Sequence, residues 1–129
     1  MIERIRKAKR VYLIGNGGSY ANAAHIANDL LDSGIRAYTL DSAALTAFAN
    51  DYGYENVFAH WLEKVGEEGD LLIALSGSGT SQNILRAIGA AGRLKMDAVI
   101  VTDYLKTLDM QQSEELQLIQ GHGWMKGLR

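Results

Sequence analysis

The stretch LLIALSGSGTS, residues 71–81, decides how this chain folds. Its first half is a run of five apolar residues, which is typical of a strand buried on both faces of a parallel sheet. Its second half, residues 76–81, combines hydroxyl side chains with glycine and predicts a tight turn. Residues 83–94 then follow a helical pattern, so the stretch predicts a strand, a turn and a helix in direct succession.

The same succession occurs nearer the amino terminus. Residues 11–14, VYLI, predict a buried strand, and residues 15–19, GNGGS, predict a tight turn into a helix that stops near Gly34. The other predicted elements are strands over residues 37–40 and 98–102, helices over residues 43–48 and 57–65, and a turn over residues 50–54. Alternating strands and helices form βαβ units. We therefore expect a three-layer α/β sandwich, flavodoxin-like or Rossmann-like, with a mainly parallel sheet of four or five strands.

The composition narrows the class of protein further. The 129 residues are 47% apolar and 22% charged, which predicts one compact domain with a real core. A net charge of −2 argues against a nucleic-acid partner, and no apolar run approaches the roughly 20 residues that cross a bilayer. There is no cysteine, which excludes disulfides and thiol catalysis, and no stretch resembles a signal peptide. We expect a cytoplasmic protein.

Both predicted turns join the end of a strand to the start of a helix, where open α/β sheets bind ligands. Glycine lets the backbone approach an anion, and the N–H groups at a helix start carry partial positive charge. The second turn adds hydroxyls that can donate to phosphate oxygens, at Ser76, Ser78, Thr80 and Ser81. Neither turn contains Lys or Arg, which excludes a P-loop, and Tyr20 stands where a dinucleotide fingerprint has its third glycine. Such turns can also be purely structural, but the hydroxyls favour phosphate binding without a nucleotide cofactor.

Five pieces of the sequence occur in the order of a known family. They are residues 15–19, the His25-x-x-x-Asp29 helix, NDYGY at residues 50–54, residues 76–81, and a late His122. On these pieces the chain resembles the SIS (sugar isomerase) domain family, and within it the phosphoheptose isomerases. The resemblance implies one compact SIS domain over residues 1–129, shortened at both ends relative to the family.

The resemblance also implies a reaction and the residues that carry it out. The implied reaction converts D-sedoheptulose 7-phosphate to D-glycero-D-manno-heptose 7-phosphate by proton transfer through an enediol. Asp29 and His122 match the family's acid/base pair, and a carboxylate and an imidazole can perform this chemistry without a redox cofactor. The positions that match the substrate-binding residues are Asn16, Gly17, Ser19, Asp51, Ser76, Ser78 and Ser81.

Some members of the family bind zinc, and the corresponding residues here are His25, Asp29, Glu114 and His122. His25 and Asp29 are four residues apart and Glu114 and His122 are eight apart, so each pair lies on one face of a predicted helix. Four nitrogen and oxygen ligands suit zinc or another divalent transition metal. The alternatives are a hydrogen-bonded surface pair at the first two positions and a solvated histidine near the terminus.

The chain departs from the family at several positions. The family usually has glutamate in place of Asp29, glutamine in place of Glu114 and arginine in place of Ser33, and its segment after Val101 is longer. These departures keep a second function open, a non-catalytic sugar-phosphate-binding module with a regulatory or protein-interaction role. The resemblance further implies a homo-oligomer, with a tetramer favoured, whose active site draws residues from neighbouring subunits.

Overall fold

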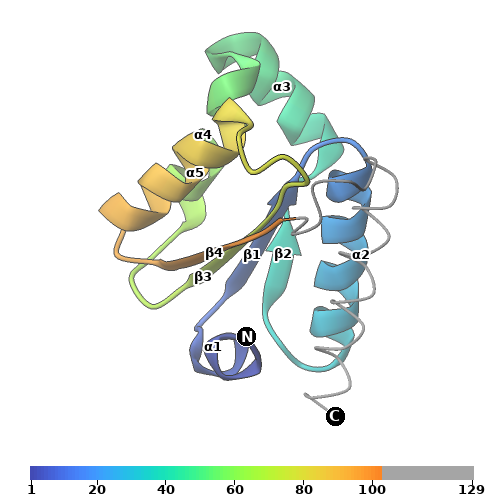
Figure 1. Ribbon diagram of the computed structural model, residues 1–129, viewed down its shortest axis with the longest axis vertical. Helices are drawn as coiled ribbons and strands as arrows, with labels where there is room; N and C mark the ends of the chain where they lie inside the picture. The colour runs from blue at the N-terminus through green and yellow to red at the C-terminus, as the bar shows by residue number, and fades with distance from the viewer. Residues whose placement is uncertain (103–129) are drawn as a thin grey trace.

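The structure is a computed structural model that describes residues 1–102 (Figure 1). Its elements in chain order are α1 (Ile2–Lys7), β1 (Val11–Gly15), α2 (Gly18–Asp32), β2 (Ala37–Thr39), α3 (Ser42–Tyr52), the 3-10 helix η1 (Tyr54–Asn56), α4 (Val57–Val65), β3 (Leu71–Leu75), α5 (Gln82–Arg93) and β4 (Asp97–Val101). No helix in this part of the chain is long and apolar enough to cross a membrane. The helix predicted over residues 114–119 lies outside the described residues.

The four strands form one sheet in the order β2-β1-β3-β4, and all three neighbouring pairs are parallel. Val11 at the start of β1 is in register with Ala37 of β2 on one side and with Leu71 of β3 on the other. Every residue of the two central strands is buried. This is why β1 and β3 read as continuous apolar runs, and the predicted parallel sheet is confirmed.

The order of the strands explains why helices lie on both faces. The chain moves outward from β1 to β2, then returns across β1 to β3 and continues to β4. Because βαβ crossovers are right-handed, these opposite directions place α2 on one face of the sheet and α4 and α5 on the other (Figure 1). The predicted three-layer sandwich is therefore confirmed. The chain leaves β1 and β3 towards opposite faces, and this switch point is where open α/β sheets bind ligands.

Alternate residues of the central strands supply two separate cores. On one face, Leu13 and Ile73 pack with buried residues of α2 and with Ile5 of α1. On the other, Ile14 and Leu72 pack with buried residues of α4 and α5. Burying each of these large apolar side chains contributes about 1.5–3 kcal/mol to the free energy of folding. The switch point therefore lies between two helical layers that are each packed firmly on the sheet.

One local prediction was wrong. The turn predicted over residues 50–54 is helical at its start, because α3 continues to Tyr52. Gly53 ends the helix with a φ of 92°, a conformation that glycine adopts without strain. Asn50 and Asp51 favour turns in isolation, but here they form the last turn of a helix whose start Asp41 caps by accepting hydrogen bonds from Ala43 N and Ala44 N.

Candidate functional site

The first turn at the switch point depends on a close backbone approach. A Cβ at Gly15 would lie 2.6 Å from the backbone carbon and oxygen of Ser19, so only glycine fits there. Gly17 has a φ of 56°, and Ser19 N donates a hydrogen bond of 2.9 Å to Asn16 O. The turn therefore folds tightly back towards the start of α2, and it holds Ser19 almost completely buried.

Serine hydroxyls hold the second turn together. Ser76 Oγ accepts a hydrogen bond of 3.0 Å from Gly79 N, and Ser78 Oγ accepts one of 3.2 Å from Thr80 N. Ser78 Oγ also lies 3.5 Å from Ser81 Oγ. A hydroxyl that accepts from the backbone still has its own hydrogen to donate. Since phosphate oxygens are hydrogen-bond acceptors, this arrangement suits an anion.

The two turns enclose a small cleft at the carboxyl ends of β1 and β3. Its volume is about 50 Å³, which admits a small group rather than a whole sugar. The residues around it are Asn16, Ser19, Leu75, Ser76, Gly77, Ser78 and Ser81. The structure thus brings five of the seven predicted substrate-binding residues to one place. Gly17 belongs to the first turn without lining the cleft, and Asp51 lies outside it.

The helices that follow the two turns add to the positive potential of the cleft. The N-cap residue of α2 is Gly17, which has no side chain, and that of α5 is Ser81, whose side chain accepts no hydrogen bond from its helix. By contrast, Asp41 caps α3. The first turns of α2 and α5 contain no acidic residue. Their N–H groups and the helix dipoles therefore favour an anion in the cleft.

An amide pair connects the two turns. Asn16 Nδ2 donates a hydrogen bond of 2.9 Å to Asn83 Oδ1, and Asn83 Nδ2 returns one of 2.8 Å to Asn16 Oδ1. Tyr54 OH donates a third hydrogen bond, of 2.6 Å, to Asn16 Oδ1. Sequence reasoning missed both Asn83 and Tyr54. The sequence did offer one indication of Asn83: it is a polar residue at helical spacing from Ala87 and Ala91, on the face of α5 that is buried.

Asp51 lies in the last turn of α3 and is exposed. Its Oδ1 accepts a hydrogen bond of 3.1 Å from the Nδ2 of neighbouring Asn50. Three residues further on, Tyr54 reaches Asn16 at the cleft. The segment predicted to lie near the substrate therefore borders the cleft, but through Tyr54 rather than through Asp51.

His25 and Asp29 form the hydrogen-bonded type of pair considered from the sequence. His25 Nε2 lies 3.2 Å from Asp29 Oδ2 on α2, and both side chains are partly exposed. Asp29 is 11 residues after the start of α2, roughly 16 Å along the helix axis, and does not line the cleft.

The pair presents one nitrogen and one oxygen that a metal could bind. Within residues 1–102, no group of three or more His, Cys, Asp or Glu side chains could hold a metal ion. Glu114 and His122, the other two predicted ligands, lie outside the described residues. The described residues therefore bring together two of the four predicted ligands, His25 and Asp29.

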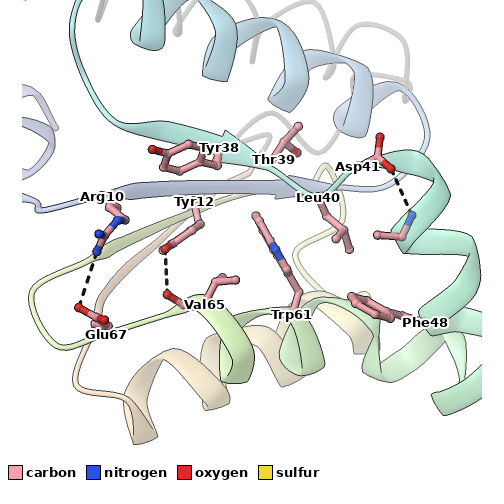
Figure 2. Close-up of a pocket in the computed structure, with 11 residues that line it drawn as sticks. Arg10, Tyr12, Tyr38, Thr39, Leu40, Asp41, Phe48, Trp61, Val65 and Glu67 are labelled. Atoms are coloured by element: carbon pink, nitrogen blue, oxygen red, sulfur yellow. Dashed lines mark hydrogen bonds and ion pairs between the residues drawn. The ribbon is translucent and has the colours of Figure 1, made fainter.

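A second and larger cavity runs beside β2, along the face of the sheet that α3 and α4 border (Figure 2). Its volume is about 680 Å³, and its walls include four aromatic side chains, those of Tyr12, Tyr38, Phe48 and Trp61. Tyr12 OH donates a hydrogen bond of 3.0 Å to Val65 O, and burial, with a smaller effect of nearby Asp70, raises the pKa of Tyr12.

Among the described residues, neither the predicted substrate-binding residues nor Asp29 line this cavity. Its charged side chains are occupied with local contacts: Arg10 pairs with Glu67 at 3.6 Å, and Asp41 caps α3. Aromatic walls offer few hydrogen bonds to a phosphate, so the smaller polar cleft is the better candidate for a sugar phosphate.

Comparison with known proteins agrees with this geometry. Residues 1–103 match the family model of the SIS domain. The chain is 38% identical, over an alignment 146 positions long, to the phosphoheptose isomerase of a Nitratiruptor species, covering 94% of this chain and 76% of that protein. It is 36% identical over 110 residues to the phosphoheptose isomerase of Thiobacillus denitrificans, covering 79% of this chain but only 56% of that protein. The chain thus spans little more than half the length of the second relative.

The fold is also close to that of a solved phosphoheptose isomerase. The structure of the enzyme from Neisseria gonorrhoeae superposes with a TM-score of 0.88 at 28% sequence identity, covering 99% of this chain and 80% of that one. The enzyme from Francisella tularensis gives a TM-score of 0.86 at 26% identity. Both the sequence and the arrangement of the strands are thus similar to those of the same group of proteins.

Proposed function

The chain belongs to the SIS domain family and, within it, to the phosphoheptose isomerases; from this premise we propose that it converts D-sedoheptulose 7-phosphate to D-glycero-D-manno-heptose 7-phosphate. Family membership supports the reaction. The observation that supports a phosphorylated substrate is the cleft between the two turns. There the oxygens of Ser76 and Ser78 accept hydrogen bonds from backbone N–H groups, so their own hydrogens remain to donate to a ligand.

In this proposal the cleft holds the phosphate. Ser76 and Ser78 donate hydrogen bonds to phosphate oxygens, and the uncapped starts of α2 and α5 add N–H groups. Neither turn contains Lys or Arg, so recognition relies on hydrogen bonds and helix dipoles. Ser19, Ser81 and Asn16 complete the cleft, and Asp51 stands near the sugar.

The chemistry takes place at the other end of the substrate. A base removes a proton from C1 of the ketose, an enediol forms, and the proton returns to C2, while the proton on O1 moves to O2; no net oxidation occurs. We assign the base to Asp29 and the transfer between the oxygens to His122. Because the length of the sugar chain separates the phosphate from C1, this pair need not lie in the phosphate cleft, and Asp29 does not. Aspartate reaches one methylene less far than the usual glutamate.

The proposed ligands of a zinc ion are His25, Asp29, Glu114 and His122. The adjacent nitrogen and oxygen of the first two support this part of the proposal. When bound, such an ion would polarise the two substrate oxygens. His25 can bind it only with a free nitrogen lone pair, so metal affinity should fall as the imidazole becomes protonated at acidic pH.

A homotetramer belongs to the same proposal. The family resemblance supports it, and His25 and Asp29 are exposed enough on α2 for residues of another subunit to approach them. Light scattering at micromolar concentration tests the assembly, and a monomer would argue against a site shared between subunits.

The reaction is tested with sedoheptulose 7-phosphate in an assay coupled to consumption of the product. We expect turnover by the wild type. Asp29→Asn and His122→Ala should each reduce kcat by about 10²–10⁴-fold, the usual contribution of a general acid or base. Asp32→Asn is the matched control, because it makes the same change at an exposed position on α2. A wild type that binds the sugar phosphate without turnover would instead support the non-catalytic binding module.

A further inference from the structure

Asn16 and Asn83 form a closed pair in which each amide donates to and accepts from the other, at 2.9 and 2.8 Å. Asn16 follows β1 directly, and Asn83 lies in the first turn of α5. The pair is therefore a direct side-chain link between the two turns that enclose the cleft. Asn83 is 3% exposed, so its side chain is enclosed by the protein and has little freedom to turn away.

The pair couples the orientations of the two amides. Rotating one amide alone by 180° would bring oxygen against oxygen and N–H against N–H, and both hydrogen bonds would be lost. Tyr54 OH adds a third hydrogen bond to the same amide, because it donates at 2.6 Å to the oxygen of Asn16 and so connects it to η1. Three hydrogen bonds thus act on one amide from two different elements.

This orientation leaves one group for a ligand. Asn16 Nδ2 has two hydrogens, and only one of them has a partner among the described residues. Asn16 itself lines the cleft, whereas Asn83 and Tyr54 do not. Asn16 thus lines the same cleft as Ser76 and Ser78, whose hydroxyls also have hydrogens to donate.

We propose that Asn83 and Tyr54 are positioning residues that orient the Asn16 amide so that its second N–H donates to an oxygen of the bound sugar phosphate. The inference rests on the proposed function, since it concerns the same cleft and substrate. Asn83 and Tyr54 act through Asn16 and make no contact with the substrate themselves. The two turns are joined through this amide, so its position depends on both.

The test is a double-mutant cycle on affinity. Dissociation constants for sedoheptulose 7-phosphate and for inorganic phosphate are measured by calorimetry for the wild type, Asn16→Ala, Asn83→Ala and the double mutant. Asn16→Ala should weaken binding roughly tenfold, as expected for a lost hydrogen bond to a charged group. Asn83→Ala should weaken it nearly as much, and the double mutant should bind no more weakly than Asn16→Ala alone. If Asn83 had only a general structural role, the losses of affinity in the two single variants would instead multiply in the double mutant.

Tyr54→Phe covers the case in which Asn83→Ala does not fold. Tyr54 is 51% exposed, so the loss of its hydroxyl leaves the core intact. We expect a several-fold loss of affinity that disappears in the Asn16→Ala background. Gln82→Ala is the matched control, since it is the exposed neighbour of Asn83 in the same helical turn and should bind like the wild type.

The outcomes separate the two proposals. The positioning role alone is overturned if the wild type binds and converts the substrate but Asn83→Ala, or Tyr54→Phe where Asn83→Ala does not fold, has unchanged affinity. It is also overturned if the losses of affinity in the single variants multiply in the double mutant. A wild type that binds neither sedoheptulose 7-phosphate nor inorganic phosphate overturns the proposed function, and the positioning role with it.

Discussion

The two turns at the cleft occupy equivalent places after β1 and β3, yet different interactions hold them. In the first, Gly15 lets the backbone lie against that of Ser19, and Ser19 N closes the turn on Asn16 O. In the second, the hydroxyls of Ser76 and Ser78 accept from backbone N–H groups. The first turn therefore needs a glycine for space, whereas in the second the side chains that hold the turn also line the cleft. The same βα connection can thus be held by a backbone contact or by side-chain hydroxyls.

The largest expected effect is on binding at the second turn. The double variant Ser76→Ala with Ser78→Ala should weaken the binding of sedoheptulose 7-phosphate by about 3–6 kcal/mol, because two hydrogen bonds to a charged phosphate are lost. Calorimetry with the folded variant measures it. Thr80→Ala is the control within the same turn, because its exposed side chain does not line the cleft. Unchanged affinity in the double variant would refute the phosphate site.

The close backbone approach at Gly15 in the first turn should affect stability. Gly15→Ala places a methyl group 2.6 Å from the backbone of Ser19, and we expect unfolding to become easier by about 1–3 kcal/mol. Urea denaturation measures the change. Gly92→Ala makes the same substitution in α5, where a Cβ would meet nothing within 4 Å, and should stabilise the protein by about 0.5–1 kcal/mol. Equal stabilities of the two variants would contradict the distinction between the turns.

The smallest effect is expected at the opposite end of the sheet. Arg4 Nε donates a hydrogen bond of 2.7 Å to Asp97 Oδ2, joining α1 to β4. This hydrogen bond lowers the pKa of Asp97 and raises that of Arg4. Since both side chains are more than 40% exposed, Asp97→Asn should cost less than about 1 kcal/mol.

The pH dependence of that small effect has a definite sign. Because the pKa of Asp97 is lower in the folded chain than in the unfolded one, its contribution is fully present above the unfolded value of about 3.9. It disappears as the pH falls through the lower, folded value. Denaturation curves of wild type and Asp97→Asn should therefore differ at pH 7 and converge below pH ~4, with sugar-phosphate affinity at pH 7 equal in both. A difference that grows at low pH would contradict this assignment.

The sequence was most informative where local and tertiary preferences agree. Strand β3 has the predicted bounds because its five apolar residues are buried on both faces and a serine-glycine turn follows. Helix α4 also has the predicted bounds, since its apolar periodicity matches its buried face. The prediction failed over residues 50–54, where turn-forming residues are held in the last turn of α3 and only Gly53 breaks the helix.

The site was predictable only in part, for a related reason. Ser76 and Ser78 could be identified from the sequence because the hydroxyl and glycine residues of their turn are consecutive. Asn83 could not, because its partner Asn16 is 67 positions away and the pairing exists only once the sheet has formed. Tyr54 was missed likewise, since it contacts Asn16 from a segment in which no residue type indicates phosphate binding.

The separation of 67 positions between Asn16 and Asn83 has a consequence for how the protein folds. The cleft spans the pairing of β1 with β3, which closes a loop containing β2, α3 and α4, and such long loops are entropically costly to close. A chain can therefore form β1 and α2 early and still have no binding site. A ligand that bridges the two turns binds only chains in which the central strands have met, and it stabilises the closed sheet by RT ln(1 + c/Kd), where c is its free concentration. The substrate would then bind only after β1 and β3 have paired and would stabilise that pairing. Its concentration would affect how often the two strands separate.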